Sequence, residues 1–468
     1  MFAATCEFSR FDADAVSGGE IMYLNGNGGV IAELSATRIA YIPNNGTLND
    51  AIAKYAFSHD ADGKRYTIGE FVRRGKNDVV DDNRLRYTLF GDPAMRLRMP
   101  EYKVRLEAIN GHAIDDNLPT FQARQTLTFS GSIVDGSGAE VTDFNGNIVS
   151  TLYDAEQSVV TLGYGEDGSQ YPFQDRSNKL ALVTDSVKNG KFSVKVTIPS
   201  ELSASSFDNY SPARMCMYAY CAASGAEAVG SNDEFYIYGY DETIETDSDG
   251  PEIRSFALNS ENFKDGDNVN ESPLVIASIF DKDGINFSSG GIGHDITLQL
   301  DGKETHSDVS SYFTPVYDKD GNAGTISYPL SGLEEGEHTL RLKVWDVFNN
   351  SSEKTISFNV VKGLKPEIYD VYTTANPAIE DAVFYLKHNR PDALLTITLQ
   401  VYDLMGKEVW SVSQTGKSDL YTSFPITWGL CDKSGGRVPR GIYVYRASIS
   451  TDGEQYTTKS KKLAVAGG

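Results

Sequence analysis

Phe2-Ala3-Ala4-Thr5-Cys6-Glu7-Phe8 stands at the start of the sequence, as a short apolar run that ends in a cysteine. Gly29-Val30-Ile31-Ala32-Glu33-Leu34 is the next apolar run, and helical patterns follow it. Short apolar strands that alternate with helices are typical of an α/β domain. Two strands cannot make the covered sheet of such a domain. We therefore expect residues 1–98 to be the C-terminal part of an α/β domain, with its other strands upstream of Met1.

Two helices are predicted within residues 1–98. Thr47 with Asp50, and Thr67 with Glu70, have the spacing of a capping box at a helix N-terminus. The apolar residues that would share one helical face are Leu48, Ala51, Ile52, Tyr55 and Ala56 in the first helix, and Ile68, Phe71 and Val72 in the second.

The rest of the sequence has the pattern of strands separated by turns. The chain holds 26 Tyr, 22 Phe and 43 Gly, which favours aromatic-rich strands and turns over a helical bundle. An acidic linker, Asp241 to Gly250, has almost no core-forming residues and marks a boundary. The sequence thus predicts a mostly β protein, in which the α/β segment is followed by two immunoglobulin-like β-sandwiches at residues 99–245 and 246–363 and by a further small β-sandwich at residues 364–468.

These sandwiches are predicted from alternating runs. The expected strands are Val104–Ala108, Thr126–Val134, Asn147–Tyr153, Lys191–Ile198, Arg214–Ala222 and Glu234–Tyr238; then Leu274–Phe280, Ile296–Leu300, Thr325–Pro329, His338–Trp345 and Lys354–Val361; then Val383–His388, Leu395–Asp403, Glu408–Val412, Phe424–Trp428, Ile442–Ser450 and Gln455–Ala464.

The charge of the chain restricts its partners. A formal net charge of -23 repels phosphate backbones, so we expect no nucleic-acid partner. No run of eighteen apolar residues occurs, and we expect no transmembrane helix. Met1 is not followed by the basic and apolar regions of a signal peptide.

Cys6 is the cysteine with a chemically informative position. A thiol at the carboxyl end of a strand lies where open α/β sheets place reacting groups. A nucleophilic thiol also needs a base, and His59, just past a predicted helix, is the nearby candidate. From the residues alone, Cys6 is either a buried structural thiol or a nucleophile, and His59 is either a solvent-facing helix end or the second member of a dyad.

The other cysteines are expected to be free. Cys216 and Cys221 lie on one predicted strand, where five residues span about 16 Å, beyond disulfide reach. Cys431 stands alone near a predicted turn. We expect all three to be core or half-buried thiols.

Two aspartate-rich segments raise the question of calcium. Asp281-Lys282-Asp283-Gly284 and Asp318-Lys319-Asp320-Gly321-Asn322 resemble the starts of calcium loops, but no glutamate completes either loop. Asp-Gly turns explain them more simply, and no cofactor is expected. His294-Asp295 could be an acid/base pair, but adjacent strand residues point to opposite faces, which favours a structural role.

The motifs of residues 1–98 resemble a known family. A strand ending in Cys6, then Ser35-Ala36-Thr37-Arg38, then Phe90-Gly91-Asp92-Pro93, have the order and spacing of the last part of a gingipain-type cysteine peptidase domain. In that family the strand ends in the nucleophilic cysteine, and the catalytic histidine lies upstream of it. The resemblance therefore implies that Cys6 is the nucleophile and that its histidine lies before Met1.

The remaining segments narrow the resemblance to the sortases of the type IX secretion system within this family. The middle segments that carry it are Asp249-Gly250-Pro251-Glu252-Ile253, Gly291-Ile292-Gly293-His294-Asp295-Ile296 and Trp345-Asp346-Val347-Phe348-Asn349-Asn350-Ser351-Ser352. Residues 364–468 are similar to the type IX sorting domain, through Asn376-Pro377, Val401-Tyr402-Asp403-Leu404-Met405-Gly406 and Gly441-Ile442-Tyr443-Val444-Tyr445. Trp428 departs from the sorting pattern, because Gly429-Leu430-Cys431-Asp432 follows it in place of an acidic residue and glycine.

The resemblance implies a cell-surface cysteine peptidase and sortase at the extracellular face of the outer membrane. Such an enzyme removes the C-terminal sorting domain of secreted cargo and attaches the cargo to anionic lipopolysaccharide, with an outer-membrane barrel shuttle protein as a further partner. Because the histidine is expected upstream, these 468 residues alone are expected to be inactive. The alternative is a secreted β-sandwich adhesin or scaffold that binds glycan or protein, since sandwiches host many functions.

Overall fold

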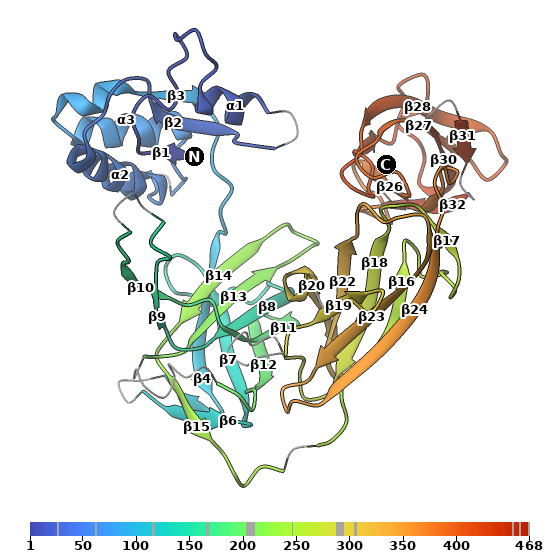
Figure 1. Cartoon of the computed structure of the whole chain (residues 1–468). Coiled ribbons are helices and arrows are strands. Elements are labelled where there is room, and N and C mark those ends of the chain that lie inside the picture. Colours follow the sequence, from blue (N-terminus) through green and yellow to red (C-terminus); the bar gives the residue numbers. More distant parts are fainter. Residues whose placement is uncertain are drawn as a thin grey trace. The chain divides into compact units, whose positions relative to one another are not determined.

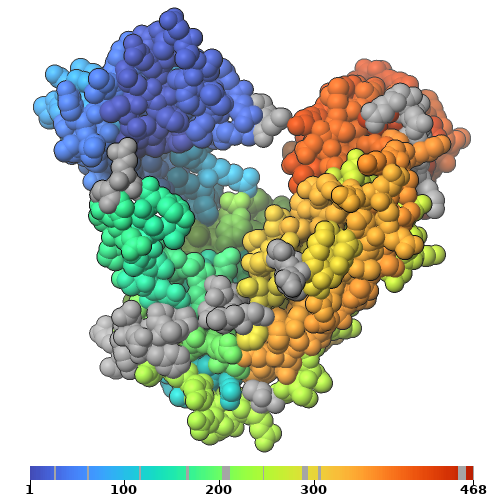
Figure 2. All heavy atoms as spheres, in the orientation of Figure 1, coloured from blue at the N-terminus to red at the C-terminus, as the bar shows by residue number. Residues whose placement is uncertain are grey.

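The computed structural model of the chain describes all residues except 26–27, 61–62, 115–117, 165–167, 203–210, 246, 287–293, 304–306, 452–453, 458–459 and 467–468. The side chains of residues 454–457 are not described either. The chain forms two compact units, Met1–Pro100 and Glu101–Gly468 (Figures 1 and 2).

The first unit contains a small mixed sheet with helices. Its strands are β1 (Phe2–Ala3), β2 (Ala32–Ala36) and β3 (Tyr87–Gly91), in the order β1-β2-β3. β1 runs parallel to β2, as the α/β pattern predicted, whereas β3 is antiparallel to β2 and was not among the expected strands. Its helices are α1 (Gly18–Leu24), α2 (Ile42–Ala56), α3 (Ile68–Asp78) and the 3-10 helix η1 (Asp82–Arg86).

The core of the first unit lies between the sheet and helices α2 and α3. Leu48 and Ile52 of α2 pack with Phe71 and Val72 of α3 and with Leu34 of β2, and all five are buried. The apolar faces predicted for the two helices therefore face this core.

The predicted start is correct for α3 and wrong for α2. Thr67 caps α3, because its hydroxyl accepts a hydrogen bond from the Glu70 N–H. Helix α2 instead begins at Ile42, so Thr47 lies inside the helix. Pro43 stands in the first turn, where its fixed φ favours a helix and its missing N–H costs nothing.

The first sandwich comprises β4 to β15. Its main sheet has the order β14-β13-β8-β11-β12-β7-β4-β5, and β14 also pairs with β4, so the sheet closes around one core. The strands are β4 (Tyr102–Ile109), β5 (His112–Ala113), β6 (Thr120–Ala123), β7 (Thr126–Val134), β8 (Gly146–Tyr153), β9 (Gln157–Val160), β10 (Pro172–Asp175), β11 (Lys179–Lys188), β12 (Lys191–Thr197), β13 (Arg214–Tyr220), β14 (Glu227–Asn232) and β15 (Tyr236–Tyr240).

The second sandwich comprises β16 to β24 and has two sheets, ordered β16-β18-β22-β21 and β17-β24-β23-β19-β20. Every second side chain of β18 is buried, which is the alternation that the sequence showed. The elements are β16 (Glu252–Leu258), β17 (Asn268–Val269), β18 (Leu274–Asp281), β19 (Thr297–Leu300), β20 (Ser307–Asp308), η2 (Ser310–Tyr312), β21 (Phe313–Asp318), β22 (Gly321–Pro329), β23 (Gly336–Trp345) and β24 (Ser351–Val360).

The terminal sandwich comprises β25 to β32. One sheet has the order β25-β26-β29 and the other β28-β27-β30-β31, with β32 also on β30. The single strand predicted at Gln455–Ala464 is wrong, because β31 and β32 are separate strands that both pair with β30. The strands are β25 (Ile368–Thr373), β26 (Ala382–His388), β27 (Leu394–Tyr402), β28 (Glu408–Lys417), β29 (Ile426–Trp428), β30 (Gly441–Thr451), β31 (Glu454–Thr457) and β32 (Lys461–Val465).

The second unit holds three separate apolar cores, one for each sandwich. The domain boundaries expected at residues 245 and 363 fall between these cores and stay predictions. The fold class is mostly β and immunoglobulin-like, as expected. None of the helices in the described part of the chain has the length and apolar content that a membrane crossing requires.

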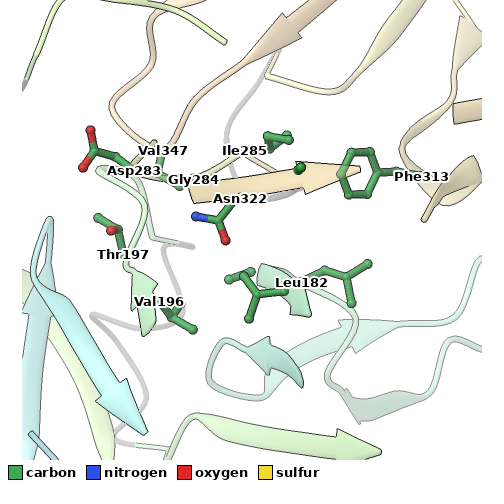
Figure 3. A pocket seen from close by; sticks show the side chains of 12 residues that line it. Leu182, Val196, Thr197, Asp283, Gly284, Ile285, Phe313, Asn322 and Val347 are labelled. Carbon is green, nitrogen blue, oxygen red and sulfur yellow. The ribbon is translucent and has the colours of Figure 1, made fainter. Parts of the chain in front are cut away.

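The first two sandwiches meet at a small joint. Leu182 on β11 packs against the core of the second sandwich, and Thr184 donates to the carbonyl oxygen of Pro315 at 3.4 Å. Figure 3 shows Leu182 and Val196 on one side of a narrow pocket, with Phe313 of the second sandwich on the other.

Candidate active site

Cys6 lies just beyond the carboxyl end of β1. β1 pairs with β2 up to Ala3, which lies opposite Ser35. Farther along, the Glu7 N–H donates to the Arg38 carbonyl oxygen at 3.2 Å, so the chain continues beside the segment that follows β2. The Cys6 side chain is exposed. The buried structural thiol is therefore the wrong interpretation, because the chain leaves the sheet before it reaches Cys6.

The sulfur of Cys6 is held by the backbone of Ala40. Cys6 Sγ donates to the Ala40 carbonyl oxygen at 3.1 Å, and the Ala40 N–H donates to Sγ at 3.3 Å. Glu7 has a φ of 51°, a left-handed conformation that is uncommon for a residue with a side chain. This tight turn fixes the direction in which the chain leaves the thiol. An exposed and positioned thiol can act as a nucleophile once a base takes its proton.

Ion pairs fasten the loop that follows Cys6. Nη1 and Nη2 of Arg38 donate to the Asp12 carboxylate, at 3.1 and 2.6 Å, and Arg38 holds the pKa of Asp12 below its usual value. Arg10 pairs with Glu7 at 3.1 Å. These side chains are exposed, so the pairs contribute little to stability but restrict where the loop lies.

His59 does not reach Cys6. Cys6 contacts Ala40, which precedes the start of α2, whereas His59 follows the end of α2 and is exposed. The helix has 15 residues and is therefore about 22 Å long. The self-contained dyad of Cys6 and His59 is thus wrong, and His59 is a solvent-facing residue beyond a helix end. It is the only histidine among residues 1–100, so no other histidine of this segment is available to Cys6.

The two aspartate-rich segments are turns. Asp281 Oδ1 accepts from the N–H groups of Asp283 and Gly284, at 2.8 and 2.7 Å, and Asp318 pairs with Arg254 at 2.8 Å. A carboxylate that accepts from the N–H groups two and three residues further on is typical of a turn, as the Asp-Gly pair predicted. Among the described residues, no group of three or more His, Cys, Asp or Glu side chains could hold a metal ion. Calcium binding stays a hypothesis without a structural site.

His294 and the three cysteines of the second unit have surroundings that indicate structural roles. His294 Nδ1 lies 3.3 Å from Glu201 Oε2, and the His294 ring packs edge-on against Trp345 at 4.6 Å between centroids. The residues before it, Gly291 to Gly293, lie outside the described part of the chain. The three cysteines of this unit are free: Cys221 is buried, while Cys216 and Cys431 are half-buried.

Sequence reasoning missed a buried polar network beneath Cys6. Asn45 of α2, Asn83 of η1 and Tyr87 of β3 are all buried and hydrogen-bonded to one another. The signal was available in Pro43-Asn44-Asn45, because asparagine is a poor residue for a helix interior and a buried one needs partners.

The fold and the position of Cys6 can be compared with known proteins. Residues 1–98 match peptidase family C25. The match confirms the gingipain-type resemblance of this segment, so the chain is related to cysteine peptidases. No curated protein sequence matches.

Two solved structures are among those similar to the chain. One is dimeric latent PorU from Porphyromonas gingivalis, at 30% identity over 94% of this chain and 41% of that one, with a TM-score of 0.38. The chain therefore spans 41% of the length of that structure. A complex of the pro- and mature domains of RgpB from Porphyromonas gingivalis matches at 15% identity over 51% of this chain and 46% of that one, with a TM-score of 0.20.

Proposed function

We propose that this chain is the C-terminal portion of a PorU-like cysteine peptidase and sortase, with Cys6 as its nucleophile. The observation that carries the proposal is an exposed, backbone-held thiol at the carboxyl end of β1, within the segment that matches family C25. The sequence motifs around Cys6 support the same assignment.

The proposed reaction has two steps. The Cys6 thiolate attacks the carbonyl carbon of the peptide bond ahead of a cargo protein's sorting domain. The C–N bond breaks, the sorting domain leaves as an amine that takes a proton from the general acid, and a thioester links the cargo to Cys6. An amine of anionic lipopolysaccharide then attacks the thioester, which forms an amide and restores the thiol.

The chain's own residues account for part of this reaction. Ala40 and the turn at Glu7 position the sulfur, and the loop fastened by Arg38 and Asp12 restricts the approach to it. The general base would be a histidine supplied from upstream of Met1, as the resemblance implies. The 468 residues without that group are expected to form no product from a sorting-domain substrate.

The partners and location follow from the same proposal. The substrates would be the sorting domains of secreted cargo proteins, the acceptor anionic lipopolysaccharide, and a further partner an outer-membrane barrel shuttle protein. The protein would work at the extracellular face of the outer membrane. The terminal sandwich, which resembles a sorting domain, would take the protein itself through the same route.

The test is a Cys6→Ala substitution in the gene of the source cells. Cargo proteins should then keep their sorting domains and lack attached lipopolysaccharide, as seen by mass and by migration on gels. A Cys431→Ala variant, which removes a half-buried thiol of the terminal sandwich, is the matched control and should process cargo normally. Normal processing by the Cys6→Ala cells would contradict the proposal and favour the adhesin or scaffold alternative.

A further inference from the structure

Two backbone segments determine where the Cys6 sulfur lies. One is the stretch from Ala4 to Cys6, which follows β1. The other is Ala40, whose N–H and carbonyl groups both bond to Sγ. β1 has only two residues, so β-sheet pairing by itself fixes the first segment weakly.

Asn45 fixes the first segment. It stands in α2, with 5% of its surface exposed, and its Nδ2 donates to the Ala4 carbonyl oxygen at 3.1 Å. Ala4 precedes Cys6 by two residues, so this bond sets the backbone from which the thiol projects.

Asn83 fixes the second segment and joins the two. Its Oδ1 accepts from the Tyr41 N–H at 2.9 Å, directly after Ala40, and its Nδ2 donates to Asn45 Oδ1 at 2.8 Å. Asn83 is 3% exposed, and its bond to Asn45 is buried and strengthened by the low local dielectric, while the bond from the Tyr41 N–H is partly buried. One bridge of two side-chain amides thus connects the two backbone segments that hold the sulfur.

Tyr87 completes the network from below. Its hydroxyl donates to Asn45 Oδ1 at 2.7 Å. The bonds to the backbone of Ala4 and Tyr41 are made by Asn45 and Asn83. Burial, with a smaller effect of the Cys6 charge, raises the pKa of Tyr87 to about 12. The Tyr87 hydroxyl therefore stays protonated at neutral pH and acts as a donor.

We propose that Asn45 and Asn83 are positioning residues, which keep the Ala40 N–H aimed at the Cys6 sulfur. The inference rests on the proposed role of Cys6 and extends it to two residues that touch neither the sulfur nor a substrate. An N–H donor to sulfur favours the ionised thiol, which is the nucleophilic form. Loss of either amide should therefore reduce the reactivity of Cys6 where the thiolate is a minority species.

The test is the rate at which iodoacetamide alkylates Cys6 in the 468-residue chain, read by mass spectrometry of the Cys6 peptide. At pH 7, Asn45→Ala and Asn83→Ala should slow alkylation about three- to tenfold, the effect of one typical intramolecular hydrogen bond. At pH 10 most thiols are ionised. The deficit should therefore disappear there.

One control variant separates positioning from loss of folding. Thr67→Ala removes the cap of α3 in the same unit and leaves both backbone anchors in place, so it should keep the wild-type rate within twofold. Asn45→Ser is the milder variant, in case the alanine variant does not fold: its hydroxyl can still pair with Asn83 or Tyr87 but is too short to reach Ala4.

The outcomes are distinct from those of the proposed function. Equal rates for wild type, Asn45→Ser and Asn83→Ala at pH 7 would overturn the positioning role, even if Cys6→Ala cells fail to process cargo. A deficit of the same size at pH 7 and pH 10 would also overturn it, because a general structural change does not depend on thiol ionisation. Normal cargo processing by Cys6→Ala cells would instead contradict the proposed sortase function, and the positioning role measured by alkylation would be unaffected.

Discussion

Asparagine at position 281 should make the second sandwich more stable at neutral pH. Asp281 is 8% exposed, and it lies near Asp346, which is 1% exposed. Burial, and then the charges of Asp346 and Asp283, raise the pKa of Asp281 from 3.8 to about 6. The folded protein therefore carries a buried negative charge at pH 7 that the unfolded chain would expose to water.

The size and sign of the effect follow from this pKa. A shift of about two units corresponds to about 3 kcal/mol at pH 7, and water near the carboxylate reduces this to about 1–3 kcal/mol. Because the pKa is raised on folding, the contribution of Asp281 to stability is greatest below pH 3.8 and is lost as the pH rises to about 6. An asparagine keeps an oxygen acceptor for the N–H groups of Asp283 and Gly284 but has no charge.

The assay is hydrogen exchange of the β18 and β23 peptides in increasing urea, at pH 4 and pH 7 with EDTA present. Asp281→Asn should stabilise these strands by about 1–3 kcal/mol at pH 7 and by almost nothing at pH 4. Asp318→Asn is the control in the same sandwich: Arg254 lowers the pKa of Asp318, so its loss should destabilise rather than stabilise at pH 7. A destabilised Asp281→Asn variant at pH 7, or an equal gain at both pH values, would refute the reasoning.

Three further results are expected. Leu182→Ala should loosen the joint between the first two sandwiches by about 1–2 kcal/mol, seen as faster hydrogen exchange in β21, and unchanged exchange would contradict the packing. His388 is fully buried, and burial lowers its pKa from 6.5 to about 4. The terminal sandwich should therefore lose stability as the pH falls from 6.5 to 4, and melting experiments should show that His388→Gln abolishes this pH dependence. Thr67→Ala should cost about 1 kcal/mol of stability in the first unit, measured by exchange in α3, and a neutral result would argue against the cap.

The sequence predicted much of the β architecture because alternation is a local property. The strand expected at Thr126–Val134 coincides with β7, and Leu274–Phe280 with β18 to within one residue. The strand β11 was missed because its Leu180-Ala181-Leu182-Val183 run does not alternate in apolar character. Leu182 packs against the core of the neighbouring sandwich rather than its own, so its apolar character does not follow the alternation of its strand.

The site was predictable in its key residue but not in its surroundings. Cys6 could be singled out from its place after an apolar run, yet its exposure depends on where β1 ends, which sequence patterns locate poorly. Asn45 and Asn83 are 38 residues apart, and Asn45 reaches back 41 residues to Ala4. Contacts of this range depend on the packing of α2 and η1, which no local pattern specifies.

The covalent link between Cys6 and cargo is the most direct test of the account. The protein should be isolated from source cells under acidic, denaturing conditions and mapped by mass spectrometry with and without hydroxylamine treatment. We expect a cargo conjugate on the Cys6 peptide that hydroxylamine removes and that is absent from Cys6→Ala cells. A conjugate that persists in Cys6→Ala cells, or that maps to another residue, would contradict it.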